Sequence, residues 1–220
     1  MSIPKTLLFL SLGSFLAVAI LQVSFSRLVV AKQTFGCAAL SSTGELDPAD
    51  TIAFWDNHTV KPLIASADDP FSKQQNVLGT SYGDKWIEVD LAKQRLTAWE
   101  GDQVFVESPI SSGLWNKTPP GEYNIWYKVK YSKMEGGIKG QRSYYYLPNV
   151  PFNMFFFGDY GIHGTYWHDN FGQPMSHGCV NTPTSVAEKL FYWTTPQLPE
   201  NKNYIRASID NPGTRVVIHE

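Results

Sequence analysis

The chain has 220 residues, of which 43% are hydrophobic and 17% charged, and its net charge is −2. This composition is typical of a globular protein and argues against a disordered one. No dense run of Lys and Arg is present, so no nucleic-acid partner is expected. The length allows one good-sized domain with extensions, or two small domains.

Residues 1–31 contain a targeting signal. Lys5 precedes an apolar run from Leu7 to Val23, which is typical of the first two regions of an export signal peptide. The run is at the short end of what spans a bilayer, so an uncleaved membrane anchor is the alternative. The segment predicts an exported protein that is either secreted or anchored to the membrane.

Residues 32–83 are rich in Ser, Thr, Asp and Pro, with scattered apolar side chains. This pattern predicts a linker or N-terminal extension with some local structure, which could pack on the main domain. Cys37 lies in it, and Cys179 is the only other cysteine. If a signal peptide were cleaved beyond Cys37, the remaining thiol could form no internal disulfide and would be either inert or reactive.

The main domain is predicted to begin at residue 84 with β-strands. Residues 85–91, 95–99 and 103–106 alternate between two faces, and Glu100-Gly101-Asp102 indicates a hairpin turn. Tyr123, Ile125, Tyr127 and Val129 predict one further strand with an apolar face. Two short strands are expected at 144–147 and 154–157, separated by prolines.

The glycine-rich segment 130–142 indicates a mobile flap or a long hairpin loop. Thr182-Pro183 predicts a helix start, and Val186, Leu190 and Trp193 supply the helix's apolar face. A closing strand is expected at 215–219. These elements predict a mostly β fold, an antiparallel sandwich or barrel-like domain over residues 84–219 with one main helix.

The stretch from His163 to Asn181 holds three of the five histidines and Cys179. Its glycine and polar residues favour a loop carried on a rigid scaffold. Gly178 would let the backbone approach a ligand, and the following helix start would favour a thiolate at Cys179. His163 and His177 are both candidates for the general base, and spacing alone does not choose between them.

Two other interpretations of this stretch remain. Cys179 could be buried and inert. Alternatively, His163, His168, His177 and Cys179 offer four possible zinc ligands. They lack a paired ligand spacing, and no Glu inside the stretch could act as a base, so neither a metal nor a cofactor is expected.

The segments Ile162-His163-Gly164-Thr165 and Ser176-His177-Gly178-Cys179-Val180-Asn181 resemble the signature of the L,D-transpeptidase catalytic-domain family. Ile110-Ser111-Ser112-Gly113, Thr118-Pro119-Pro120-Gly121 and the final Gly213–Ile218 run are similar to the family's pattern in the same order. The resemblance covers residues 84–219 and implies a cysteine acyltransferase that acts on peptidoglycan stem peptides in the bacterial cell envelope.

The resemblance also implies a role for each matching residue. Cys179 would be the nucleophile and His163 the base, with the carbonyl of Gly164 orienting the imidazole. His177 and Gly178, with Cys179, would shape an oxyanion hole through backbone N–H groups, while Ser176 and Asn181 would hold the loop. Tyr166 and Trp167 are expected either to flank the substrate cleft or to pack under the loop. His168 is not part of the signature.

The implied reaction begins with attack of Cys179 on the diamino acid at the third position of a stem tetrapeptide, which releases the terminal D-alanine. An amine of a second stem then takes the acyl group from the thioester. Segment 130–142 is the candidate lid that would keep water from the cleft. An L,D-carboxypeptidase, attachment of a protein amine to the wall, a zinc hydrolase and a non-catalytic wall-binding module are the alternatives.

Overall fold

The computed structural model describes residues 42–63 and 84–220. The expected signal segment and Cys37 lie outside the described residues. Among the residues that are described, no helix is both long and apolar enough to cross a membrane.

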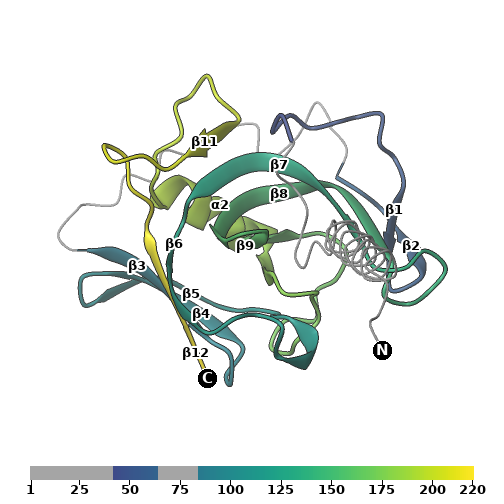
Figure 1. Ribbon diagram of the computed structural model, residues 1–220, viewed down its shortest axis with the longest axis horizontal. Helices are drawn as coiled ribbons and strands as arrows, with labels where there is room; N and C mark the ends of the chain where they lie inside the picture. Colours follow the sequence, from purple (N-terminus) through teal and green to yellow (C-terminus); the bar gives the residue numbers. More distant parts are fainter. Residues whose placement is uncertain (1–41, 64–83) are drawn as a thin grey trace, which may run out of the picture. The chain divides into compact units, whose positions relative to one another are not determined.

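The smaller of two sheets has five strands in the order β5-β4-β3-β12-β6 (Figure 1). Its strands are β3 (Lys85–Asp90), β4 (Arg95–Glu100), β5 (Gln103–Pro109), β6 (Gly121–Asn124) and β12 (Arg215–His219). The first three are the strands that the alternating pattern predicted. A two-residue turn joins β4 to β5, and Gly101 adopts φ 60° there, as a glycine can without strain.

The larger sheet has seven strands, and its centre is the long hairpin β7–β8. Its strands are β1 (Ala53–Trp55), β2 (His58–Val60), β7 (Tyr127–Gly136), β8 (Tyr145–Phe157), β9 (Tyr160–Thr165), β10 (Val180–Pro183) and β11 (Tyr204–Arg206). The order is β10-β9-β8-β1-β2, and β7 pairs with both β8 and β11. Most neighbours are antiparallel, but β9–β10 and β3–β12 are parallel.

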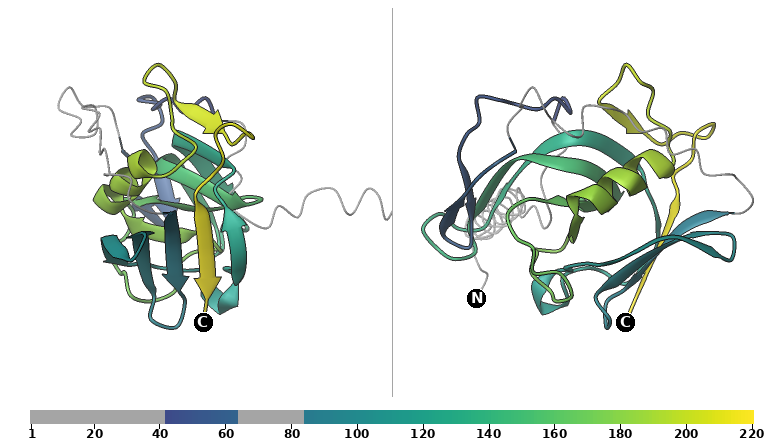
Figure 2. Two further views of the ribbon diagram at one scale, coloured as in Figure 1. Left: turned by 90° about the vertical axis from the view of Figure 1, so that its left-hand side faces the viewer. Right: turned by 180° about the vertical axis from the view of Figure 1, so that it is seen from behind.

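Helix α2 (Thr184–Trp193) packs against β8 and β9 of the larger sheet (Figure 2). Its buried face, which includes Leu190 and Phe191, joins Ile87, Leu96 and Val216 of the smaller sheet in the principal core. The mostly β fold with one main helix is therefore confirmed. The helix begins at Thr184, with Pro183 at the N-cap position, because Thr182 still pairs in β10.

The strand expected through Tyr123 and Val129 is two strands in different sheets. The N–H of Ile125 donates to the carbonyl of Thr214, whereas the N–H of Trp126 donates to the carbonyl of Phe155. The chain thus changes sheets between these two residues, although the alternation of apolar side chains continues through the junction.

The two short strands expected on either side of the prolines form one strand, β8. Pro148 and Pro151 are tolerated because the strand is irregular there: Asn149 and Phe152 have φ of 55° and 57°, and the register with β7 shifts between Ser132 and Met134. The hairpin predicted from the glycines is present, but β7 extends to Gly136, and only residues 137–144 form its loop. We call residues 137–144 the flap.

The described part of the N-terminal extension contains a β-hairpin, β1–β2, which joins the larger sheet. Asp56 and Asn57 form its two-residue turn with φ of 46° and 64°, values that Asp and Asn tolerate. Phe54 pairs with Tyr146 of β8. The hairpin is thus part of the same sheet as β9 and β10, which border the central stretch of the sequence.

Candidate active site

The parallel pair β9–β10 positions the two halves of the central sequence stretch. Asn181 is the register partner of His163, and Val180 that of Ile162. Cys179 immediately precedes β10 and lies two residues before Asn181. Because side chains alternate along a strand, a side chain two residues before Asn181 is expected on the face that His163 also occupies.

His163 is almost fully buried, and its Nδ1 lies 3.1 Å from the carbonyl oxygen of Gly164. This contact makes Nδ1 the donor and leaves Nε2 with the lone pair. Nε2 is buried and has no hydrogen-bond partner among the described residues. Burial lowers the pKa of His163 to about 4, partly opposed by the bond to Gly164, so the imidazole is neutral at neutral pH and can accept a proton.

Gly164 allows a close approach that orients this ring. A Cβ atom on Gly164 would lie 2.9 Å from Cγ of Pro151 and 3.1 Å from the Cα of Thr184. Any larger residue would therefore push β9 away from β8 and from the start of α2.

The sulfur of Cys179 is fully buried and packs in a cluster with Tyr145 and Trp167. It is disulfide-bonded in this structure. The sulfur in this state is therefore neither reduced nor accessible to solvent. Nucleophilic attack needs a reduced thiolate and a path to it.

Internal hydrogen bonds fix the loop that carries Cys179. The Ser176 hydroxyl donates to the carbonyl of Cys179 at 2.5 Å and accepts from the N–H of Gly178 at 3.0 Å. The Thr118 hydroxyl donates to the carbonyl of Gly178 at 2.8 Å. Gly178 has φ 143°, and a Cβ atom there would lie 2.3 Å from the ring of Tyr160. The N–H of Gly178 is thus engaged within the loop.

Asn181 links this loop to His168. Its Nδ2 lies 2.9 Å from Nε2 of His168, and its backbone N–H and C=O both bond to Ser111. Burial lowers the pKa of His168 to about 4, so this ring is also neutral. His168, which the signature leaves without a role, therefore lies against a signature residue.

Tyr166 and Trp167 make packing contacts. The Tyr166 hydroxyl donates to the carbonyl of Pro148 at 2.5 Å. Trp167 is 8% exposed, and its ring centroid lies 5.8 Å from that of His163 and 5.0 Å from that of Tyr166. Trp167 thus packs on the ring of His163, and Tyr166 packs on Trp167.

The ring of His177 points to the β7–β8 hairpin. Its centroid lies 4.6 Å from that of Tyr145 and 6.0 Å from that of Trp55. The pKa of His177 is lowered by burial and by the nearby charge of Lys117, and a hydrogen bond with the backbone of Ser143 only partly opposes this. Trp55 and Tyr145 were not predicted as site residues. Asp56-Asn57 is a local turn signal that could have indicated the β1–β2 hairpin, but not the approach of Trp55 to the site.

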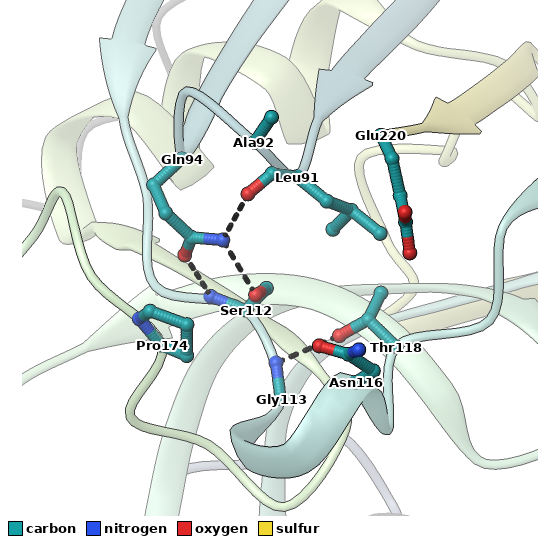
Figure 3. A pocket seen from close by; sticks show the side chains of 9 residues that line it. All are labelled: Leu91, Ala92, Gln94, Ser112, Gly113, Asn116, Thr118, Pro174 and Glu220. Carbon is teal, nitrogen blue, oxygen red and sulfur yellow. Dashed lines mark hydrogen bonds between the residues drawn. The ribbon is translucent and has the colours of Figure 1, made fainter.

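A pocket of about 240 Å³ lies beside the loop that carries Cys179 (Figure 3). Gln94 holds its wall: its amide donates to the Ser112 hydroxyl at 2.8 Å and accepts from the Ser112 N–H at 2.9 Å. Thr118 also lines it and accepts from the N–H of Gly113. Neither Cys179 nor His163 lines this pocket, so it adjoins the candidate site and is not its centre.

The described parts of the chain contain no group of three or more His, Cys, Asp and Glu side chains that could hold a metal ion. The four ligands considered for zinc from the sequence are thus not gathered into a metal site there.

Comparison with known proteins gives a family match over most of this region. The family model for the L,D-transpeptidase catalytic domain (YkuD) matches residues 84–218, more than half of the chain. No curated protein sequence matches the chain.

Solved structures are similar as well. An L,D-transpeptidase from Mycobacterium smegmatis is 18% identical with a TM-score of 0.50, and the match covers 62% of this chain and 59% of that one. The C442S mutant of the Enterococcus faecium L,D-transpeptidase is 28% identical with a TM-score of 0.47, covering 62% and 50%. The matched region thus spans only about half to three fifths of these two structures.

Proposed function

The chain belongs to the L,D-transpeptidase catalytic-domain family, and on this premise we propose that it is a peptidoglycan L,D-transpeptidase with Cys179 as its nucleophile. The observation that carries the proposal is the register of β9 and β10. In this register Asn181 pairs with His163 and Cys179 lies two residues before Asn181, and the buried Nε2 of His163 has no hydrogen-bond partner among the described residues.

In the first step, the Cys179 thiol loses its proton to Nε2 of His163, and the sulfur attacks the carbonyl carbon of the diamino acid in a donor stem. The tetrahedral intermediate collapses with cleavage of the bond to D-alanine, whose leaving amine takes the proton from His163. The product is a thioester.

In the second step, an amine of another stem attacks the thioester carbonyl and gives its proton to His163. The sulfur leaves as a thiolate, and a new amide joins the two stems. The carbonyl of Gly164 keeps Nδ1 protonated throughout, so that Nε2 alone exchanges protons.

The backbone N–H groups of His177 and Cys179 are the candidate donors to the developing oxyanion, because the N–H of Gly178 already donates to Ser176. Ser176 and Asn181 hold the loop rather than contact substrate. We assign Tyr166 and Trp167 to the support of His163.

Access to the sulfur requires movement, since Cys179 is buried beside Tyr145, the first residue after the flap. We infer that the flap opens to admit the stems and closes to keep water from the thioester. We propose that the export signal expected from residues 1–31 directs the enzyme to the bacterial envelope, where it would be secreted or anchored to the membrane.

Discharge of the same thioester by water or by a wall-attached protein's amine would give the L,D-carboxypeptidase or protein-attachment activity. Incubation with a disaccharide-tetrapeptide and mass analysis of the products distinguishes them: a dimer, a tripeptide or an exchange product is formed. The zinc-hydrolase alternative predicts that a chelator abolishes activity, whereas the thiol mechanism predicts loss with iodoacetamide alone.

The primary test is acylation by a carbapenem, whose strained ring offers an electrophilic carbonyl. After reduction of the protein, mass spectrometry should detect a single adduct on Cys179. The adduct should be absent from Cys179→Ala and should form at least about 100-fold more slowly in His163→Gln, because the base is removed. A folded, reduced wild-type protein that forms no adduct would contradict the proposed function.

A further inference from the structure

Trp55 lies outside the residues that match the family, yet its side chain is part of the candidate site. Its ring centroid lies 5.9 Å from that of His168 and 6.0 Å from that of His177. It also lies 5.9 Å from Trp167 and 6.4 Å from Tyr145. One side chain of the extension therefore contacts two histidines of the central stretch and Tyr145 at the base of the flap.

The position of Trp55 is fixed by the hairpin that carries it. Ala53 is fully buried, and Phe54 pairs with Tyr146 in β8. At the turn, both carboxylate oxygens of Asp56 accept hydrogen bonds from the Arg142 guanidinium of the flap, each at 3.1 Å. Strand β1 of the hairpin thus pairs with the larger sheet, and the hairpin's turn contacts the flap.

Trp55 is only partly buried by these neighbours, although its strand neighbour Ala53 is completely covered. This partly exposed indole contacts the ring of His177, which is two residues from Cys179 in the sequence. Indole is the best of the protein aromatic rings for contact with an ammonium group, and it also packs well on methylene chains. The donor stem presents both groups at its reacting residue, because a diamino acid carries an amine on an aliphatic chain.

We propose that Trp55 contacts the diamino acid side chain of the donor stem and determines the affinity of the enzyme for it. This inference rests on the proposed function. It assigns to the N-terminal hairpin a part of the substrate site that the family-matched domain does not itself contain.

The test measures binding separately from turnover. Calorimetry with a stem tetrapeptide uses full-length Cys179→Ala protein, which cannot react, alone and combined with Trp55→Ala, Trp55→Phe or Phe54→Ala. Trp55→Ala should weaken binding about tenfold, and Trp55→Phe by less, because the phenyl ring retains part of the contact. Phe54→Ala is the matched control: it is the adjacent hairpin residue and makes none of the ring contacts of Trp55, so its binding should be unchanged.

A second ligand tests the chemistry. A tetrapeptide with its diamino side chain acetylated should bind the Trp55-containing protein several-fold more weakly than the free amine does, and Trp55→Ala should remove most of this difference. Equal binding by Trp55→Ala and the parent protein, or no binding by either, would overturn the inference. An equal loss in Phe54→Ala would show a structural role of the hairpin and would overturn it too.

The carbapenem adduct of the wild-type protein tests the proposed function independently, since the drug lacks the diamino side chain. An adduct together with unaltered tetrapeptide binding in Trp55→Ala would preserve the transpeptidase assignment and refute the role of Trp55.

Discussion

At the scale of single residues, two neutral histidines share the candidate site. His163 is held by Gly164 and His168 by Asn181, and the two rings are close enough for His168 to lower the pKa of His163. A thiolate formed at Cys179 would raise the pKa of His163 by attraction, which is the direction that proton transfer requires. Burial therefore keeps the His163 imidazole neutral, so that it can accept a proton when the thiolate forms.

This burial predicts how stability depends on pH. Burial lowers the pKa of His163 from 6.5 to about 4. Between these values the unfolded chain binds a proton that the folded chain does not, so the free energy of unfolding should fall as the pH drops from 6.5 to 4. The slope is at most about 1.4 kcal/mol per pH unit for His163, and less for the partly exposed His168.

Urea denaturation between pH 7 and pH 4 measures this slope, and His163→Gln should flatten it. His219→Gln is the control. The hydrogen bond to Glu88 raises the pKa of His219, so its proton is bound in both states below pH 6.5 and the decline should be unaltered. An equal flattening by both substitutions would contradict the assignment.

At the scale of elements, Lys128 of β7 closes the end of α2. Its ammonium donates to the carbonyls of Phe191 and Thr194 at 2.5 and 2.8 Å, and it is almost fully buried. Cations are favourable at a helix C-terminus, but burial still lowers the pKa of Lys128 to about 7. The helix that follows β10 is thus held to the long hairpin by a charge in the core.

The sign of the pH effect for Lys128 follows from its lowered pKa. Above pH 7 the folded chain releases this proton, whereas the unfolded chain retains it up to about 10.5. The free energy of unfolding should therefore rise between pH 7 and pH 9, by up to about 1.4 kcal/mol per unit. Lys128→Met should abolish the rise, and the exposed Lys189→Met on α2 should retain it. Thermal or urea unfolding across this range checks both.

The elements that could be predicted from the sequence are those with local causes. The alternation of β3, β4 and β5 sets their faces, and their short turns lie in the same stretch of chain. The division between β6 and β7 depends on Thr214 and Phe155, which lie 30 or more residues from Ile125, so no local pattern contains it. The continuity of β8 through Pro148 and Pro151 likewise depends on the irregular register with β7.

The candidate site likewise has residues that the sequence identifies and contacts that only the folded structure creates. Cys179, His163 and Gly164 lie in two short segments that the family signature identifies. The bond between Asn181 and His168 and the approach of Trp55 arise only when the sheet has formed. Trp55 comes from a segment whose composition is that of a linker, and its partners lie more than 85 residues further along the chain.

At the scale of the whole described structure, Asn149 attaches the N-terminal extension to the catalytic domain. It is buried and lies in β8. Its amide nitrogen donates to the carbonyls of Asp47 and Leu63 at 2.9 and 2.8 Å, and its oxygen accepts from the N–H of Asp47 at 2.8 Å. One side chain therefore ties down the segment on both sides of the β1–β2 hairpin.

Asn149→Ala should release this segment. The loss of three hydrogen bonds and the exchange of Asn for Ala at φ 55° should lower the free energy of unfolding by about 2–3 kcal/mol. Hydrogen exchange should lose protection in residues 47–60 first. The exposed Asn201→Ala should leave both quantities unchanged, and unaltered protection of β1 in Asn149→Ala would refute the attachment.

The parallel pairing of β9 with β10, and not the polypeptide between them, sets the spacing between Cys179, the proposed nucleophile, and His163, the proposed base. Residues 169–173 form a connecting excursion whose exposed Asp169 and Asn170 could be lengthened or shortened while sulfur and imidazole stay in register. A single insertion between Cys179 and Asn181 would instead turn the sulfur to the opposite side of the sheet. Natural variation in chain length should therefore occur within residues 169–173 and be absent from residues 179–181.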